Sequence, residues 1–299
     1  MQKRVLGKTG YQVSAVVYGG IISMNEGQAA SDRYVSWAID QGVNYFDVAP
    51  TYGDAEEKLG NSLKPYRKEV YLVCKTTERM KEDAEKELKR SMELLHTDYF
   101  DNFQLHSMTK PEDVEKAFGP GGIMELLIPL KEKGVIRKLG FSAHSEIAAL
   151  KCLELYDFDT ALFPMNYMLD MNEGIGSELA QKAKEKGFGL LGMKTLIERA
   201  WKDDSERKNG IYPKSWCKPF DVDQNELRIA AMKYSLAMGS DVLVPPGNWE
   251  NFSFMVEHID ECLSNPLNEN DTELLKQHFE IVKSMPFFKK DNGGWPVEA

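Results

Sequence analysis

Short apolar runs rich in β-branched and aromatic residues alternate with amphipathic segments along most of the chain. The apolar runs suit burial on both faces of a sheet and predict strands at 13–19, 44–48, 70–74, 99–105, 136–141, 160–165, 188–193 and 241–244. The segments between them predict helices at 28–41, 55–63, 81–96, 122–133, 146–156, 174–187, 223–238 and 248–262. Such strand-then-helix units, repeated over about 250 residues, are typical of a parallel (β/α)8 barrel.

The two ends of the chain predict additions to this barrel. "RVLG" and "VSAVVYGG" flank "KTGY", with Gly7 and Gly10 as turn residues, which predicts an N-terminal β-hairpin. Residues 266–299 predict one more helix and a tail draped over the barrel. No linker, low-complexity tract or change of composition divides the chain. We therefore expect residues 1–299 to form a single α/β domain, a TIM barrel with an N-terminal β-hairpin and an extra C-terminal helix.

An open doubly wound sheet is the alternative arrangement of alternating strands and helices. Such a sheet usually carries a G-x-G-x-x-G turn after its first strand, where it binds a dinucleotide. The stretch "VVYGGIISMNEG" at this place lacks the pattern, so the sequence favours the barrel.

Charge and cysteine spacing argue against several classes of function. The formal net charge of −10 disfavours nucleic acids and anionic membranes as partners, because both reward clustered Lys and Arg. The four cysteines form no C-x-x-C pair, so we expect neither a thiolate metal site nor a disulfide scaffold. The chain has no run of about 18 apolar residues and no apolar leader segment. We therefore expect a cytoplasmic protein.

Polar residues follow three neighbouring predicted strands, at the ends where barrel enzymes have their active sites. Asp47 ends the second strand, and Tyr52 lies in the loop after it. Lys75 and His106 end the third and fourth strands. Each of these residues could have a structural role alone. The aspartate could cap the following loop, and the tyrosine could pack against it. The lysine could extend its ammonium group into solvent, and the histidine could be a hydrogen-bonded structural residue. Their combination at one rim favours a catalytic site.

Proton transfer to a carbonyl is the chemistry that such a group can perform. A phenol has a pKa of about 10 and is a poor acid at neutral pH. We expect the Lys75 cation to lower the pKa of Tyr52, with Asp47 holding the lysine. His106 could orient a carbonyl oxygen or assist the proton transfer. No side chain supplies a hydride, so the redox partner must be a cofactor.

Four spaced motifs carry a resemblance to a known family. They are "GVNYFDVAPTYG" (42–53), "VYLVCKT" (70–76), "YFDNFQLHS" (99–107) and "GVIRKLGFSAHS" (134–145). In order and spacing they resemble the signatures of the aldo-keto reductases, and the likeness runs from "LGKTGYQVSAVVYGG" to about residue 260. The resemblance implies an NAD(P)H-dependent oxidoreductase that reduces an aldehyde or ketone to an alcohol. It also implies a catalytic tetrad of Asp47, Tyr52, Lys75 and His106.

The same resemblance implies where a nicotinamide cofactor binds. The implied contacts are Ser142, Asn166, Met193, Lys194, Leu196 and Gly247, the last before a helix start suited to a phosphate. Ala143 stands where the family usually has Asn, and Met193 stands where it usually has an aromatic ring. Residues 247–258 contain no Arg or Lys for a 2′-phosphate, so NADP(H) is only slightly favoured and NAD(H) stays possible. The "MKTL" pattern resembles a subgroup with a C-terminal iron–sulfur segment, but without C-x-x-C we expect no iron–sulfur cluster.

The loops at the mouth of the barrel indicate where the substrate binds, but they do not identify the carbonyl compound. We expect specificity to reside in 20–28, 107–123 and 197–221. The long stretch 196–220 is a candidate lid, in which Trp201, Tyr212 and Trp216 either line the site or pack the loop onto the barrel. A cofactor-binding regulatory relative, similar to potassium-channel β subunits, is the alternative function. A barrel hydrolase or lyase would need a carboxylate pair or a metal cluster that the rim does not offer. The oligomeric state and the direction of the reaction stay open.

Overall fold

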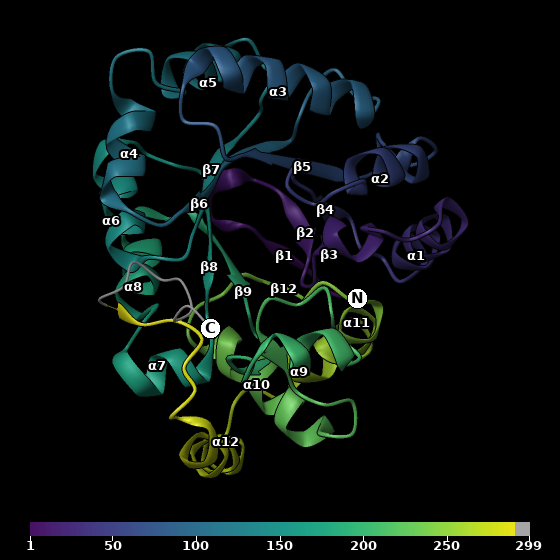
Figure 1. Ribbon diagram of the computed structural model, residues 1–299, viewed down its shortest axis with the longest axis vertical. Helices are drawn as coiled ribbons and strands as arrows, with labels where there is room; N and C mark the ends of the chain where they lie inside the picture. Colours follow the sequence, from purple (N-terminus) through teal and green to yellow (C-terminus); the bar gives the residue numbers. More distant parts are fainter. Residues whose placement is uncertain (291–299) are drawn as a thin grey trace.

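Residues 1–290 are described by the computed structural model, which has parallel strands surrounded by helices (Figure 1). The strands form one sheet in the order β12-β9-β8-β7-β6-β5-β4-β3. Their bounds are β3 (Tyr18–Gly19), β4 (Tyr45–Asp47), β5 (Tyr71–Thr76), β6 (Asn102–Met108), β7 (Leu139–Ala143), β8 (Thr160–Pro164), β9 (Gly189–Met193) and β12 (Val242–Val244). A parallel bridge between Val16 and Leu243 joins the two ends of the sheet. The predicted eight-stranded barrel is therefore confirmed.

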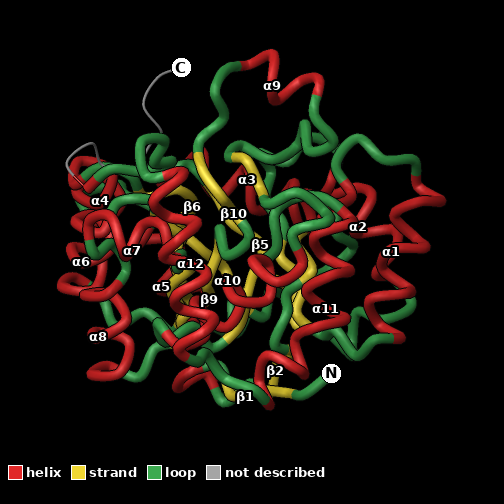
Figure 2. The backbone as a smooth tube through the Cα atoms, turned by 90° about the horizontal axis from the view of Figure 1, so that it is seen from below, coloured by secondary structure: helices red, strands yellow, loops and turns green. Residues whose placement is uncertain are grey.

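The helices lie outside the strands and cover the barrel (Figures 1 and 2). All eight helices predicted between strands are present: α1 (Gln28–Asp40), α2 (Ala55–Leu63), α3 (Lys81–Leu94), α5 (Met124–Glu132), α6 (Glu146–Leu155), α8 (Ser177–Lys186), α10 (Asn225–Ala237) and α11 (Trp249–Ser264). The sequence did not predict the short helices α4 (Pro111–Phe118), α7 (Tyr167–Glu173) and α9 (Asp204–Asn209). None of the three is longer than eight residues, so each has too few turns to show a clear helical pattern of apolar residues.

The N-terminal hairpin closes one end of the barrel. Strand β1 (Lys3–Val5) pairs antiparallel with β2 (Gln12–Ser14), and Gly7 and Gly10 adopt positive φ angles between them. The prediction of one strand over 13–19 is wrong, because the run is divided between β2 and β3. The first part of this apolar run pairs in the hairpin, and the second part pairs in the barrel sheet. Figure 2 shows β1 and β2 at the opposite end of the molecule from α9.

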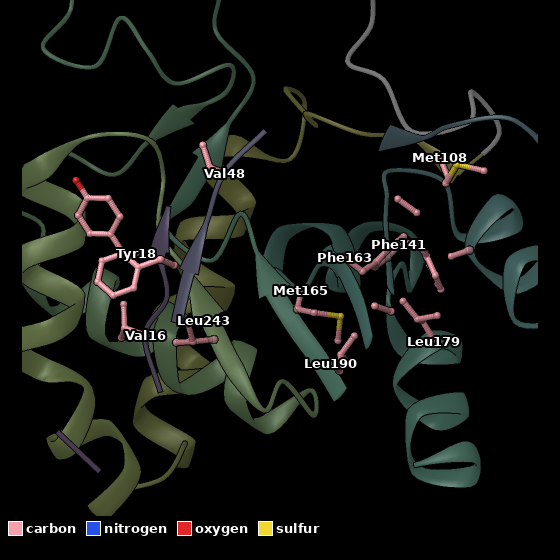
Figure 3. Close-up of a cluster of buried hydrophobic side chains, with 14 of the residues drawn as sticks. Val16, Tyr18, Val48, Met108, Phe141, Phe163, Met165, Leu179, Leu190 and Leu243 are labelled. Atoms are coloured by element: carbon pink, nitrogen blue, oxygen red, sulfur yellow. The ribbon is translucent and has the colours of Figure 1, made fainter. Parts of the chain in front are cut away.

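An apolar layer between strands and helices holds the fold together, and Figure 3 shows part of it. Val16 and Leu243 meet where the sheet closes, and the ring of Tyr18 packs against Phe46 with centroids 5.1 Å apart. These side chains are fully buried. Burying one large apolar side chain contributes about 1.5–3 kcal/mol, so a continuous layer of them dominates the stability.

The C-terminal part of the chain returns towards the mouth of the barrel. Helix α12 (Glu269–Val282) confirms the predicted additional helix and starts with a capping box between Asn268 and Asp271. After it, the carbonyl of Met285 accepts a hydrogen bond from Ala200 N at 2.9 Å. The rest of the predicted tail, 291–299, lies outside the described residues. Among the helices of residues 1–290, none has the length and hydropathy needed to cross a membrane.

Candidate active site

A pocket opens at the carboxyl ends of the barrel strands. Its lining comes from strand ends and from the loops that follow them: Gly19, Ile21, Asp47, Tyr52, His106, Ser142, His144, Leu162, Met193, Lys194, Ile197, Lys214, Ser215, Trp216, Val244, Pro245, Pro246 and Gly247. The predicted tetrad members Asp47, Tyr52 and His106 therefore share one cavity. The fourth member, Lys75, is fully buried directly behind them.

Lys75 connects the aspartate to the tyrosine. Its ammonium group forms a buried ion pair with Asp47 Oδ1 and donates a hydrogen bond to the Tyr52 hydroxyl oxygen at 3.3 Å. The strands explain this arrangement, since Asp47 is the last residue of β4 and Lys75 is the last but one of the neighbouring strand β5. Tyr52 is held by turns on both sides, because its N–H donates to Ala49 O and its carbonyl accepts from Ala55 N, each at 3.0 Å.

Burial and charge act in opposite directions on these groups. Burial raises the pKa of Tyr52 above its ordinary value, and the Lys75 cation only partly offsets this. Our prediction of a lowered phenol pKa is therefore wrong in its net direction. Burial likewise raises the pKa of Asp47 against the opposing effect of Lys75. For Lys75, burial lowers the pKa, but the Asp47 carboxylate and Tyr52 outweigh it, so the lysine stays cationic at neutral pH.

His106 lies beside the phenol as a neutral group. Its ring meets the Tyr52 ring edge-on, with centroids 5.8 Å apart, and its Nδ1 lies 3.5 Å from Thr51 Oγ1. Burial, reinforced by the Lys75 cation, lowers the pKa of His106 well below its ordinary value. A neutral imidazole can donate one hydrogen bond, which suits a carbonyl oxygen placed between it and the phenol.

Arg79 also shapes the site, although no sequence pattern predicts it. Its guanidinium donates to Thr77 O at 2.9 Å, to His106 O at 2.6 Å and to Ser107 O at 3.3 Å. It therefore ties the backbone after β5 to the end of β6, which sets the position of His106 relative to Lys75. Arg79 lies in the loop before α3, and no local pattern links it to the next strand.

The predicted cofactor contacts divide into two groups. Ser142, Met193, Lys194 and Gly247 line the pocket. The Ser142 hydroxyl accepts a hydrogen bond from Ser107 N at 2.8 Å. A Cβ on Gly247 would come within 2.6 Å of the Ile21 side chain, so the glycine permits this close approach of two loops.

Leu196 and Asn166 lie outside the pocket lining. Leu196 is fully buried in the hydrophobic core. The Asn166 amide donates to the carbonyls of Lys194 and Ile197 at 2.8 and 2.9 Å, and its Oδ1 accepts from Met168 N at 2.8 Å. Asn166 therefore holds the backbone after β9 in place.

The long stretch 196–220 forms one side of the pocket. Its ends pair as the short antiparallel strands β10 (Ile197–Arg199) and β11 (Lys218–Pro219). Between them, Lys214 donates to Glu26 Oε1 at 2.6 Å, which links the stretch to the loop after β3. Of the three aromatic candidates, Trp216 lines the pocket, whereas Tyr212 is buried and Trp201 donates to Ser215 O at 2.9 Å.

A sequence model described as the aldo/keto reductase family matches residues 19–237. The chain belongs to this family. Aldo/keto reductases are oxidoreductases that use nicotinamide cofactors.

Curated relatives match the chain in part. The aldo-keto reductase YhdN of Bacillus subtilis is 29% identical over 168 residues, which are 48% of this chain and 48% of the relative. The uncharacterized oxidoreductase YqkF of the same organism is 29% identical over 157 residues, which are 48% of this chain and 49% of the relative. The chain thus spans about half the length of the curated relatives it matches.

Solved structures share the fold over nearly the whole chain. An aldo-keto reductase from Bacillus halodurans, in its holo form, superposes with a TM-score of 0.70 at 20% identity and covers 97% of this chain and 99% of its own. An aldo/keto reductase from Brucella melitensis gives a TM-score of 0.64 at 15% identity over 93% of this chain and 100% of its own. At this identity the likeness shows the fold alone.

Two positions depart from the usual family pattern. Ala143, where Asn is usual, is fully buried in β7 and offers no amide to the pocket. His144 follows it and lines the pocket, with Nδ1 3.4 Å from Ser107 Oγ. Burial and the Lys194 cation lower the pKa of His144 to about 3, so this imidazole is also neutral at pH 7. Met193 lines the pocket where an aromatic ring is usual.

Proposed function

We propose that this protein reduces an aldehyde or ketone to an alcohol with NAD(P)H, and that Tyr52 is the general acid. The observation that carries the proposal is the contact between Lys75 and Tyr52. A fully buried lysine, ion-paired with Asp47, donates a hydrogen bond to a phenol oxygen at the wall of the pocket.

The residues of the pocket fit a nicotinamide cofactor. The Gly247 cradle, which a Cβ would fill, lies one residue before Asn248, the N-cap of α11, and the N–H groups of a helix start suit a phosphate. Ser142 supplies a hydroxyl and Met193 supplies an apolar wall. These residues would hold the cofactor. When bound, the nicotinamide supplies the hydride that reduces the carbonyl carbon.

The chain's own residues supply the proton. The raised pKa of Tyr52 keeps the phenol protonated at neutral pH, so it is available as a donor to the developing alkoxide oxygen. Once the proton has left, the Lys75 ammonium stabilises the phenolate across their 3.3 Å contact. Asp47 keeps that cation in the dry interior, and neutral His106 donates a hydrogen bond to the same substrate oxygen.

Replacing Tyr52 by Phe tests the assignment. Tyr52→Phe removes the phenol oxygen and leaves the ring, so the pocket keeps its shape. We expect carbonyl reduction to fall by about 10²–10⁴-fold, while NADPH still binds when titrated by fluorescence. Near wild-type turnover in this variant would remove Tyr52 from its role. A wild-type protein that binds NADPH but reduces no member of a carbonyl panel would instead be a regulatory relative.

A further inference from the structure

Lys194 is held in an unusual backbone conformation at the mouth of the pocket. It follows β9 directly and has a φ angle of 66°, in the left-handed region that non-glycine residues rarely adopt. The fully buried Asn166 keeps it there through the hydrogen bonds to the carbonyls of Lys194 and Ile197. Strained backbone persists only where the surroundings determine it, and such positions cluster at ligand sites.

The side chain of Lys194 faces aromatic rings rather than a carboxylate. Its ammonium nitrogen lies 5.3 Å from the Trp216 ring centroid and 6.0 Å from the Phe288 ring centroid. No carboxylate within residues 1–290 comes within 4.0 Å of it. The other lysine of the pocket lining, Lys214, is paired with Glu26. Among residues 1–290, Lys194 is therefore the lysine of the pocket lining whose positive charge no carboxylate neutralises.

One of the two rings connects this cation with the ends of β6 and β7. Phe288 belongs to the segment after α12, and its ring lies 5.3 Å from the ring of His144. His144 lies beside Ser107 at the end of β6, whereas Gly247 and Ile21 lie together at the start of α11. The Phe288 ring is only 2% exposed, and a buried aromatic wall excludes water, which strengthens the attraction between an ammonium group and an anion.

We propose that Lys194 binds an anionic group, a carboxylate or a phosphate, of the carbonyl substrate. The preferred substrates are then acidic aldehydes or ketones, whose anionic end lies between Trp216 and Phe288 while the carbonyl reaches Tyr52. This inference rests on the proposed function and names its substrate class. The cofactor diphosphate is a second source of the same chemistry, which the experiment separates.

Two aldehydes of similar shape test the inference. The measurement is kcat/KM for 4-carboxybenzaldehyde and for the uncharged 4-nitrobenzaldehyde, with one cofactor at saturation. We expect the wild-type protein to prefer the carboxylate, and Lys194→Met to lower the ratio of the two constants by about 10- to 100-fold. Lys194→Arg should keep most of the ratio. Lys208→Met is the matched control, because this exposed lysine of α9 pairs only with Asp204 among the described residues.

The outcomes separate this inference from the proposed function. An unchanged ratio in Lys194→Met overturns the inference, whatever the turnover of the neutral aldehyde. If Lys194→Met weakens the affinity for NADPH and leaves the ratio unchanged, Lys194 binds the cofactor diphosphate. That result also overturns the inference. Calorimetry of the product 4-(hydroxymethyl)benzoate with NADP⁺-saturated protein gives a readout without turnover. Equal binding by wild type and Lys194→Met overturns the inference there, and binding weakened by about tenfold or more in the variant supports it.

Discussion

Replacing Lys75 by Met leaves a carboxylate alone in the interior of the barrel. Lys75 is fully buried and Asp47 is only 3% exposed, so water cannot replace the lost cation. Asp47 Oδ2 already has no hydrogen-bond partner among the described residues, which leaves Oδ1 dependent on Lys75. Removing one partner of a buried ion pair costs about 3–5 kcal/mol of unfolding free energy, and we expect a loss in this range near pH 8.

The loss should depend on pH, with a definite sign. Burial already raises the pKa of Asp47, and without Lys75 nothing opposes that rise. A carboxyl group whose pKa is raised by folding favours the folded state at low pH, and this contribution is lost as the pH increases from about 4 towards the raised pKa. The variant should therefore be closer to wild type at about pH 5 than at about pH 8.

Urea unfolding followed by tryptophan fluorescence measures both effects. The double variant Asp47→Asn, Lys75→Met lacks the stranded charge and should be more stable than Lys75→Met alone. Lys86→Met, which breaks only the exposed pair with Asp83 on α3, is the control and should leave the midpoint unchanged. The reasoning fails if Lys75→Met loses less than about 1 kcal/mol at pH 8, or if its loss is independent of pH.

Three further predictions concern the pocket. Arg79→Met should shift the acidic limb of the pH–rate profile to higher pH, because Arg79 is one of the cations that hold down the pKa of His106; an unshifted limb would contradict this. Gly247→Ala should raise the Kd of NADPH about tenfold or more, since its Cβ would meet the Ile21 side chain; unchanged affinity in a fluorescence titration would refute the close approach. NADPH should exceed NADH by less than about 100-fold in kcat/KM, because 247–258 offers no Arg or Lys. Initial rates with both cofactors measure this, and a preference of several thousand-fold would require a phosphate clamp elsewhere.

Local pattern was enough to predict the barrel and the meeting of three polar side chains at its rim. Asp47, Lys75 and His106 each end an apolar run that is short enough to be a strand, and parallel strands of a barrel end at one rim. Their meeting therefore follows from the number of repeats and the position of each residue in its run. Arg79 could not be found in this way, since it acts on a neighbouring strand through backbone carbonyls.

The sign of the Tyr52 pKa shift depended on packing. The sequence places a cation near the phenol, which alone lowers the pKa. Only the folded chain shows how completely the surroundings exclude water, and that desolvation outweighs the charge. The division of 13–19 into β2 and β3 also depended on tertiary structure. The apolar pattern is continuous, but its first part pairs in the hairpin and its second part pairs in the barrel sheet.

The sequence by itself determined the repeating strand–helix order, the strand-end residues and the family, because these depend on residues near one another in the chain. Tertiary structure alone decided what surrounds Lys194. Trp216 comes from the excursion after β9, where the sequence left open whether its ring lines the site or packs the loop. Phe288 comes from the segment after α12, which has no sequence pattern that points to the pocket. Contacts between such distant segments depend on how loops pack over the rim, and loop packing has no periodicity from which a sequence could predict it.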